Sequence, residues 1–203
     1  DAIFEDVNND GQLDSKDMKF MGYIRPDKVG GIVNSFKYKG LTVRVVMDWA
    51  MGHVIDNGFK GQIMGSSRNN NNAIKDAMTN SWQSANDGTK YPKYTVQSDY
   101  DYQYRNHMRW DNQIGSSESG STNNSLYVSK RDYLAFREVS LSYMLPSTWV
   151  RKIRLSGVEV FAGAYNIGYI KKYDGMFPEI YTGVDYGVYP RPRQYNMGVK
   201  INF

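Results

Sequence analysis

The chain has 203 residues, of which 23% are charged and 14% aromatic, and its formal net charge at pH 7 is +4. Mean hydropathy is −0.62, and no run of about 18 apolar residues occurs, so no transmembrane helix is predicted. The cations are scattered rather than gathered in a stripe, which argues against nucleic-acid binding, and the absence of cysteine excludes disulfides and thiolate chemistry.

Near the start of the chain, residues 6–17 (DVNNDGQLDSKD) follow the spacing of a calcium-binding loop, with Gly11 at the sharp turn. The predicted ligands are Asp6, Asn8, Asp10, Gln12 through its backbone carbonyl, Asp14 and Asp17. The last position carries Asp where an EF-hand has Glu, so we expect a structural Ca²⁺ held weakly, with a dissociation constant on the order of 10⁻⁴ to 10⁻³ M. The alternative is an Asx-rich turn without a metal.

Residues 30–39 and 41–55 are predicted to form two β-strands joined by a tight turn. In the second segment apolar side chains occupy every other position, as in a strand with one apolar face. This set comprises Leu41, Val43, Val45, Met47, Trp49 and Met51. Lys39-Gly40 separates the two segments, and glycine suits the backbone angles of a two-residue hairpin turn.

The connection at roughly 53–132 is far longer than a usual loop. Within it, Ile74, Met78 and Trp82 recur at helical spacing. Asn72 precedes them, so a short helix capped by that residue is predicted. The following stretch is rich in tyrosine, whose aromatic ring carries a polar hydroxyl, and it is predicted to contact a substrate or a partner protein. The alternative is that it packs against neighbouring loops. The predicted contact residues are Tyr91, Tyr94, Tyr100, Tyr102, Tyr104 and Trp110.

Three further strands are predicted near 133–145, 155–167 and 193–203. Along the last of them, apolar residues alternate with polar or small ones. The apolar set is Tyr195, Met197, Val199, Ile201 and Phe203, and the opposite set is Asn196, Gly198, Lys200 and Asn202. The apolar set can face lipid or the core of a soluble protein. If this face meets lipid, Tyr195 and Phe203 lie near the two membrane interfaces.

The connections between these five strands alternate in length. Those at Lys39-Gly40 and roughly 146–154 are short, whereas those at roughly 53–132 and 168–192 are long. Short turns therefore share one rim of the sheet and long loops the other, which is typical of outer-membrane barrels.

Several short motifs occur in the C-terminal third of the chain. They are YMLP at 143–146, a strand ending near Asn166, YDGMFPE at 173–179 and YPRPRQY at 189–195. Together with the 6–17 loop and the hairpin after it, they resemble the C-terminal end of SusC/RagA-type TonB-linked outer-membrane proteins. Asn166-Ile167-Gly168 departs from the family's usual Asn-Leu-Phe type sequence, which leaves the end of that strand open.

The resemblance implies an all-β fold made of the C-terminal antiparallel strands of a transmembrane β-barrel of about 22 strands with long extracellular loops. Residues 1–203 would form this C-terminal segment, with residues 1–29 as an extracellular loop carrying the calcium motif. The plug domain would lie outside this chain. The implied location is the bacterial outer membrane, in contact with its lipid.

The implied function is TonB-dependent import of a nutrient, a glycan or oligosaccharide or a peptide. The expected partners are a SusD-like surface lipoprotein, the remainder of the barrel with its plug, and TonB, which would be reached through the part of the protein outside this chain.

No enzyme is expected, because His53 and His107 are the only histidines and neither has a partner at catalytic or metal-binding spacing. The alternative function is that of a secreted soluble β-sandwich that binds carbohydrate and holds a structural calcium.

Overall fold

The computed structural model describes residues 5–12, 15–64, 74–85, 88–89, 91, 93 and 125–203. The chain divides into two compact units. One comprises Asp1–Ile24, Val54–Ser129 and Glu179–Val188, and the other comprises Arg25–His53, Lys130–Pro178 and Tyr189–Phe203. No helix in the described part of the chain is long and apolar enough to cross a membrane.

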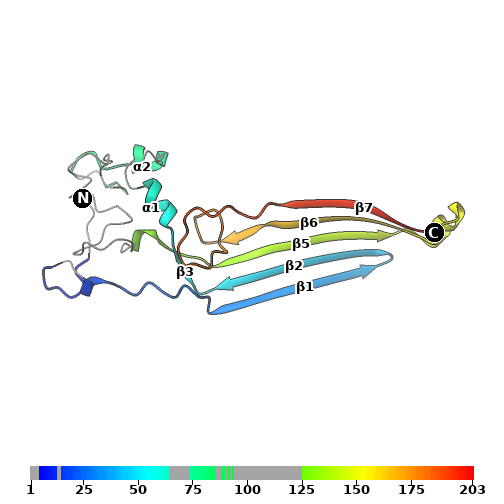
Figure 1. Cartoon of the computed structure of the whole chain (residues 1–203), viewed down its shortest axis with the longest axis horizontal. Helices are drawn as coiled ribbons and strands as arrows, with labels where there is room; N and C mark the ends of the chain where they lie inside the picture. The colour runs from blue at the N-terminus through cyan, green and yellow to red at the C-terminus, as the bar shows by residue number, and fades with distance from the viewer. Residues whose placement is uncertain are drawn as a thin grey trace. The chain divides into compact units, whose positions relative to one another are not determined.

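The second unit is built on a five-stranded antiparallel sheet in the order β1-β2-β5-β6-β7 (Figure 1). The strands are β1 (Lys28–Tyr38), β2 (Leu41–Met51), β5 (Tyr133–Met144), β6 (Gly157–Lys171) and β7 (Gln194–Asn202). Each of the five predicted strands therefore has a counterpart in the sheet. The predicted antiparallel all-β fold class is confirmed.

The short connections lie at the same end of the sheet. Lys39 and Gly40 form the β1–β2 turn with φ of 46° and 85°, and a Cβ on Gly40 would lie 2.7 Å from the carbonyl oxygen of Met144. The β5–β6 connection at this end is more than a turn, since it holds α4 (Ser147–Val150) and the 3₁₀ turn η4 (Arg151–Ile153). The side chain of Val150 is buried there.

Two strand ends differ from their predicted positions by more than two residues. β2 ends at Met51 rather than at 55, and residues Val54–Asp56 form a separate strand, β3. β6 continues to Lys171, past the predicted end at 167. It does so through an irregularity in which Asn166 adopts a φ of 51°, a conformation that asparagine tolerates better than most residues.

The register places the side chains of the sheet on two chemically distinct faces, because directly paired residues share a face. One, called here the apolar face, includes Phe36, Val43, Val45, Met47, Trp49, Val139, Leu141, Tyr143, Val160, Met197, Val199 and Ile201. The other, called the polar face, includes Ser35, Thr42, Arg44, Asp48, Glu138, Ser140, Ser142, Gly163, Tyr165, Asn196 and Lys200.

Many large side chains of the apolar face are exposed, among them Phe36, Leu141, Met197 and Val199. Exposure of so extensive an apolar surface to water is energetically unfavourable. The alternation predicted for 193–203 is thus present in the structure.

The first unit contains β3, which forms a two-stranded sheet with β4 (Val128–Lys130), together with short helices. These are α1 (Gly58–Met64), α2 (Lys75–Thr79) and the 3₁₀ turns η1 (Ser15–Asp17) and η3 (Ser125–Tyr127). The predicted helix exists as α2, but its N-cap is Ile74 rather than Asn72, and Trp82 lies beyond its end. Ile55 and Tyr127 are almost completely buried in this unit.

Candidate functional site

The predicted calcium loop is closed by hydrogen bonds from its own backbone. The carboxylate of Asp6 accepts the N–H groups of Gly11 and Asp10, at 2.8 and 3.3 Å. Asp17 accepts the N–H of Val7 at 2.9 Å, so the two ends of the loop are in contact. Asp10 accepts the N–H of Gln12 and the side-chain amide of Asn8, both at 2.9 Å.

The structure thus gathers Asp6, Asn8, Asp10, Gln12 and Asp17 in one loop, whereas Asp14 lies outside the described residues. Among the residues described, no group of three or more Asp, Glu, His or Cys side chains is placed to hold a metal ion. The calcium site stays a prediction.

Of the predicted aromatic contacts, only Tyr91 is described; Tyr94, Tyr100, Tyr102, Tyr104 and Trp110 lie outside the described residues. Tyr91 is 8% exposed, and its hydroxyl donates a hydrogen bond to Asp76 of α2 at 2.7 Å. This hydrogen bond is the main reason why the pKa of Tyr91 is raised. In this structure its hydroxyl is hydrogen-bonded to α2, and the role of Tyr91 in binding stays a prediction.

The polar face carries two ion pairs between β2 and β5. Arg137 forms a bidentate pair with Asp48, with Nη2 at 2.8 Å from Oδ1 and Nε on the other oxygen. The Nε of Arg44 lies 3.4 Å from Glu138. Arg137 and Glu138 are consecutive, yet both reach this face because Arg137 is the extra residue of a bulge between Phe136 and Glu138.

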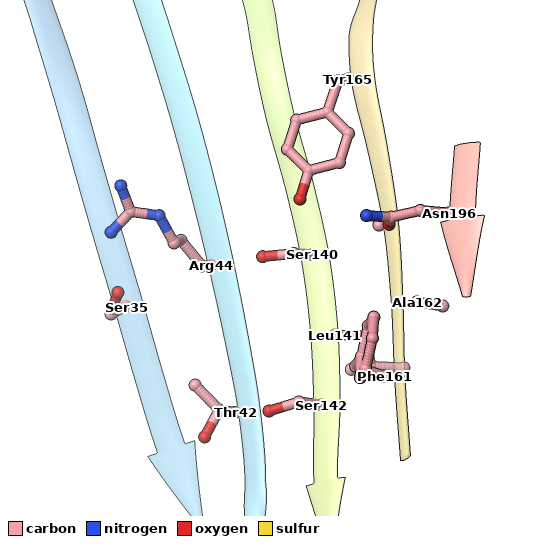
Figure 2. Close-up of a pocket in the computed structure, with 11 residues that line it drawn as sticks. Ser35, Thr42, Arg44, Ser140, Leu141, Ser142, Phe161, Ala162, Tyr165 and Asn196 are labelled. Carbon is pink, nitrogen blue, oxygen red and sulfur yellow. The ribbon is translucent and has the colours of Figure 1, made fainter. Parts of the chain in front are cut away.

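A shallow cavity of about 260 Å³ opens on the polar face. Its lining comes from all five strands, and Figure 2 shows the side chains that gather around it. Small hydroxyl residues, Ser35, Thr42, Ser140 and Ser142, lie beside the rings of Phe161 and Tyr165. The sequence pattern placed Thr42, Arg44 and Asn196 opposite the apolar set, but it did not join the five strands into one site.

At the long-loop end of the sheet, His53 is buried beside charged residues of the segment that enters β5. Its Nδ1 lies 3.9 Å from Asp132, its carbonyl accepts the N–H of Arg131 at 2.9 Å, and its ring meets Tyr133 edge-on. Asp132 also accepts the N–H of Gly52 at 2.7 Å. The sequence showed His53 without a spaced partner, because the partner is 79 positions further along the chain and only pairing of β2 with β5 brings it near.

The pKa of His53 is held below its ordinary value of 6.5, first by burial and then by the positive charge of Arg131, while Asp132 and Asp27 oppose this. The folded protein therefore favours the neutral ring. Its contribution to stability is present above about pH 6.5 and is lost as the pH falls below it.

We expect the unfolding temperature of the complete protein to fall between about pH 7 and pH 5, and to fall less in a His53→Phe variant, which keeps a ring against Tyr133. Thermal unfolding in detergent at a series of pH values measures this. An equal fall in both proteins would show that His53 is not the responsible group.

Comparison with known proteins relates the whole chain to one kind of receptor. No protein-family model matches the chain. Two TonB-dependent receptors of Formosa agariphila are 25% and 24% identical over 99% and 100% of it. The TonB-dependent receptor SusC of Bacteroides thetaiotaomicron is 26% identical over 44% of the chain.

Solved structures share the fold of this chain. A structure of the RagAB peptide transporter matches 96% of the chain with a TM-score of 0.69 and 20% identity, and one of the RagAB peptide importer in an open-open state matches 89% with a TM-score of 0.64 and 22% identity. The chain is thus similar in sequence to TonB-dependent receptors, SusC among them, and similar in fold to the RagAB structures.

The predicted resemblance is confirmed, and the two-faced sheet belongs to the barrel of an outer-membrane protein. The relatives are receptors and an importer, not enzymes, in agreement with the prediction that this chain catalyses no reaction. The chain spans about a fifth of the two Formosa receptors, 19% of each, and 17% to 20% of the matched structures.

Proposed function

We propose that this SusC-like chain forms part of the wall of an outer-membrane importer that carries a nutrient through a plugged barrel. One observation carries the proposal: the same five strands present one mainly apolar face and one mainly polar face. A wall between lipid and an aqueous interior requires this pattern. The soluble β-sandwich is disfavoured, because the apolar side chains are exposed rather than packed in a core.

The proposed cargo is a glycan or oligosaccharide, with a peptide as the second candidate. The relationship to SusC-type receptors and the fold shared with a peptide importer support these two classes. The proposed partners are a SusD-like lipoprotein on the cell surface, the remaining strands and plug of the same protein, and TonB as the source of energy.

The experiment compares cells that carry or lack the complete protein. Uptake of complex nutrient mixtures, followed by mass spectrometry of what leaves the medium, is expected to lose one class of compound when the protein is deleted. The same loss is expected when TonB is removed. Purification from detergent-solubilised envelope is expected to recover a lipoprotein with the barrel. Unchanged uptake in both deletions would refute the proposal.

We also propose that the 6–17 loop lies on the extracellular side and binds Ca²⁺, and that the bound ion stabilises the loop. The closed loop supports this, because Asp6, Asp10 and Asp17 each accept a backbone N–H within it and calcium takes oxygen ligands of this kind. The turn geometry alone would serve a metal-free loop equally well.

Asp10→Ala is expected to weaken calcium binding by the complete protein at least tenfold, since it removes a central carboxylate. Isothermal titration calorimetry measures this. Glu5→Gln is the matched control, because it removes a neighbouring carboxylate that is not a predicted ligand. Equal affinities of the Asp10→Ala variant and the unmodified protein would remove the calcium site.

A further inference from the structure

The β5–β6 connection, residues 146–156, exposes two large apolar side chains. It lies at the end of the sheet that also carries the β1–β2 turn, called here the short-turn end, and Figure 1 shows it in yellow beside the end of β7. Trp149 of α4 is 62% exposed and Ile153 of η4 is 65% exposed. Residues four apart along a helix are neighbours on its surface. The two side chains therefore form one apolar patch.

Backbone hydrogen bonds fix both ends of this connection to the sheet. Before it, the N–H of Leu145 donates to the carbonyl of Val158 in β6 at 2.9 Å. After it, the N–H of Ser156 donates to the carbonyl of Asn202 in β7 at 2.8 Å. Between them, the side chain of Val150 is buried. The fold itself thus holds the apolar patch outward, at the end of the strands.

The cationic side chains at the short-turn end have no acidic partners. They are Lys37, Lys39, Arg151, Lys152 and Arg154, and all five are exposed. Within the described residues, none of them forms an ion pair. An acidic residue near these strand ends, Glu159, stands directly opposite Lys200 on the polar face. The short-turn end therefore carries an excess of positive charge, which favours an anionic partner.

An aromatic row on the apolar face of the sheet precedes these cations. Tyr38 of β1 and Tyr143 of β5 both pair with Leu41 of β2, so the three side chains share that face. Tyr38 is 58% exposed, and Lys39 lies 5.3 Å from the centre of its ring. Tyrosine and tryptophan collect where the hydrocarbon of a membrane meets the headgroups. Apolar side chains, then aromatic rings, then cations is the order that matches hydrocarbon, interface and phosphate.

This order favours lipid over a soluble protein as the partner. The aromatic row belongs to a face whose large side chains are exposed across the sheet, among them Phe36, Leu141 and Val199. A soluble protein bound at the short-turn end would leave that face uncovered. A membrane covers the face and meets the cations at the same time.

We propose that the β5–β6 connection, together with the β1–β2 turn, binds the headgroups of anionic phospholipids. Trp149 and Ile153 enter the boundary between headgroups and hydrocarbon. Arg151, Lys152 and Arg154 contact the lipid phosphates, which arginine binds with two parallel N–H groups. The proposal rests on the membrane wall proposed above and goes beyond it, because transport of a nutrient does not itself require a preference among lipids.

The test uses the complete protein in detergent, with phosphatidylglycerol and phosphatidylcholine of identical acyl chains as probes. Native mass spectrometry counts the bound lipids, and we expect phosphatidylglycerol to be preferred roughly tenfold. In a variant with Arg151→Gln, Lys152→Gln and Arg154→Asn, this preference is expected to fall by roughly fivefold or more. Asparagine is chosen at position 154 because it tolerates the φ of 61° found there.

The matched control combines Arg25→Gln, Lys28→Gln and Arg193→Gln. It removes the same charge from exposed residues at the opposite end of β1 and β7 and is expected to keep the preference. Trp149→Ala gives a second readout. It is expected to weaken binding of both lipids alike, because insertion of the ring does not depend on the charge of the headgroup.

An unchanged preference in the Arg151, Lys152 and Arg154 variant would overturn the lipid site. So would an equal loss in the matched control, displacement of the bound lipid by inorganic phosphate, or competition by a soluble envelope protein for the same residues. A lost preference together with normal TonB-dependent uptake would support the lipid site. Uptake that is unaffected by deletion of the whole protein would refute the transport function and leave the lipid site standing.

Discussion

Val199→Arg is expected to destabilise the complete protein in a lipid bilayer by about 2 to 4 kcal/mol, because it places a charge on the lipid side of a membrane strand. Val199 pairs with Val160 near the middle of β7 and is 57% exposed on the apolar face. The free energy of unfolding, measured by denaturant titration of the protein in lipid vesicles, gives the cost directly. The cost is greatest if Val199 lies at the bilayer midplane.

The matched control is Lys200→Arg, which puts the same side chain one residue further along, on the polar face. Its expected cost is close to zero, since a cation already stands there in contact with water. Equal stability of the two variants would mean that the apolar face does not meet hydrocarbon. The assignment of these strands to a membrane wall would then be wrong.

The alternation that makes Val199 informative is also the reason why the sheet could be predicted. Apolar residues occupy every second position along β2 and β7, and this spacing is typical of a strand with two chemically different faces. The turn at Lys39-Gly40 could also be predicted from local sequence. A glycine between two strand segments is typical of a tight turn, and Gly40 adopts the φ of 85° that glycine tolerates.

Features that depend on pairing between distant segments could not be predicted. The bulge in β5 shows in sequence only as two successive charges, Arg137 and Glu138, where alternation would place one. Their partners on β2 are 89 and 94 positions away along the chain. The cavity on the polar face likewise requires all five strands in register, and no single segment of the sequence predicts it.

The calcium motif is the opposite case, because its spacing is local. The backbone hydrogen bonds of Asp6 and Asp17 confirm a closed loop, but the same bonds form in a metal-free Asx turn. Sequence and structure therefore agree that this loop is closed. Whether it binds Ca²⁺ is measured by calorimetry.

Breaking the Asp48–Arg137 pair is expected to cost about 1 to 3 kcal/mol, because the bidentate geometry satisfies a guanidinium only 21% exposed. The guanidinium also lies 5.8 Å from the centre of the Tyr169 ring, so removal of Asp48 leaves a charge held between a ring and a strand. A double-mutant cycle with Asp48→Ala, Arg137→Ala and both together separates the pair from the loss of each side chain.

The Arg44–Glu138 pair is the internal control for this cycle. It crosses the same two strands, but it has one contact of 3.4 Å and its arginine is 46% exposed. Its expected coupling energy is below about 1 kcal/mol, as for surface pairs. Larger coupling for Arg44–Glu138 than for Asp48–Arg137 would contradict the view that the bulge in β5 serves to bring Arg137 onto Asp48. Equal coupling energies would mean that water at the inner wall screens both pairs alike, and that burial against Tyr169 adds nothing.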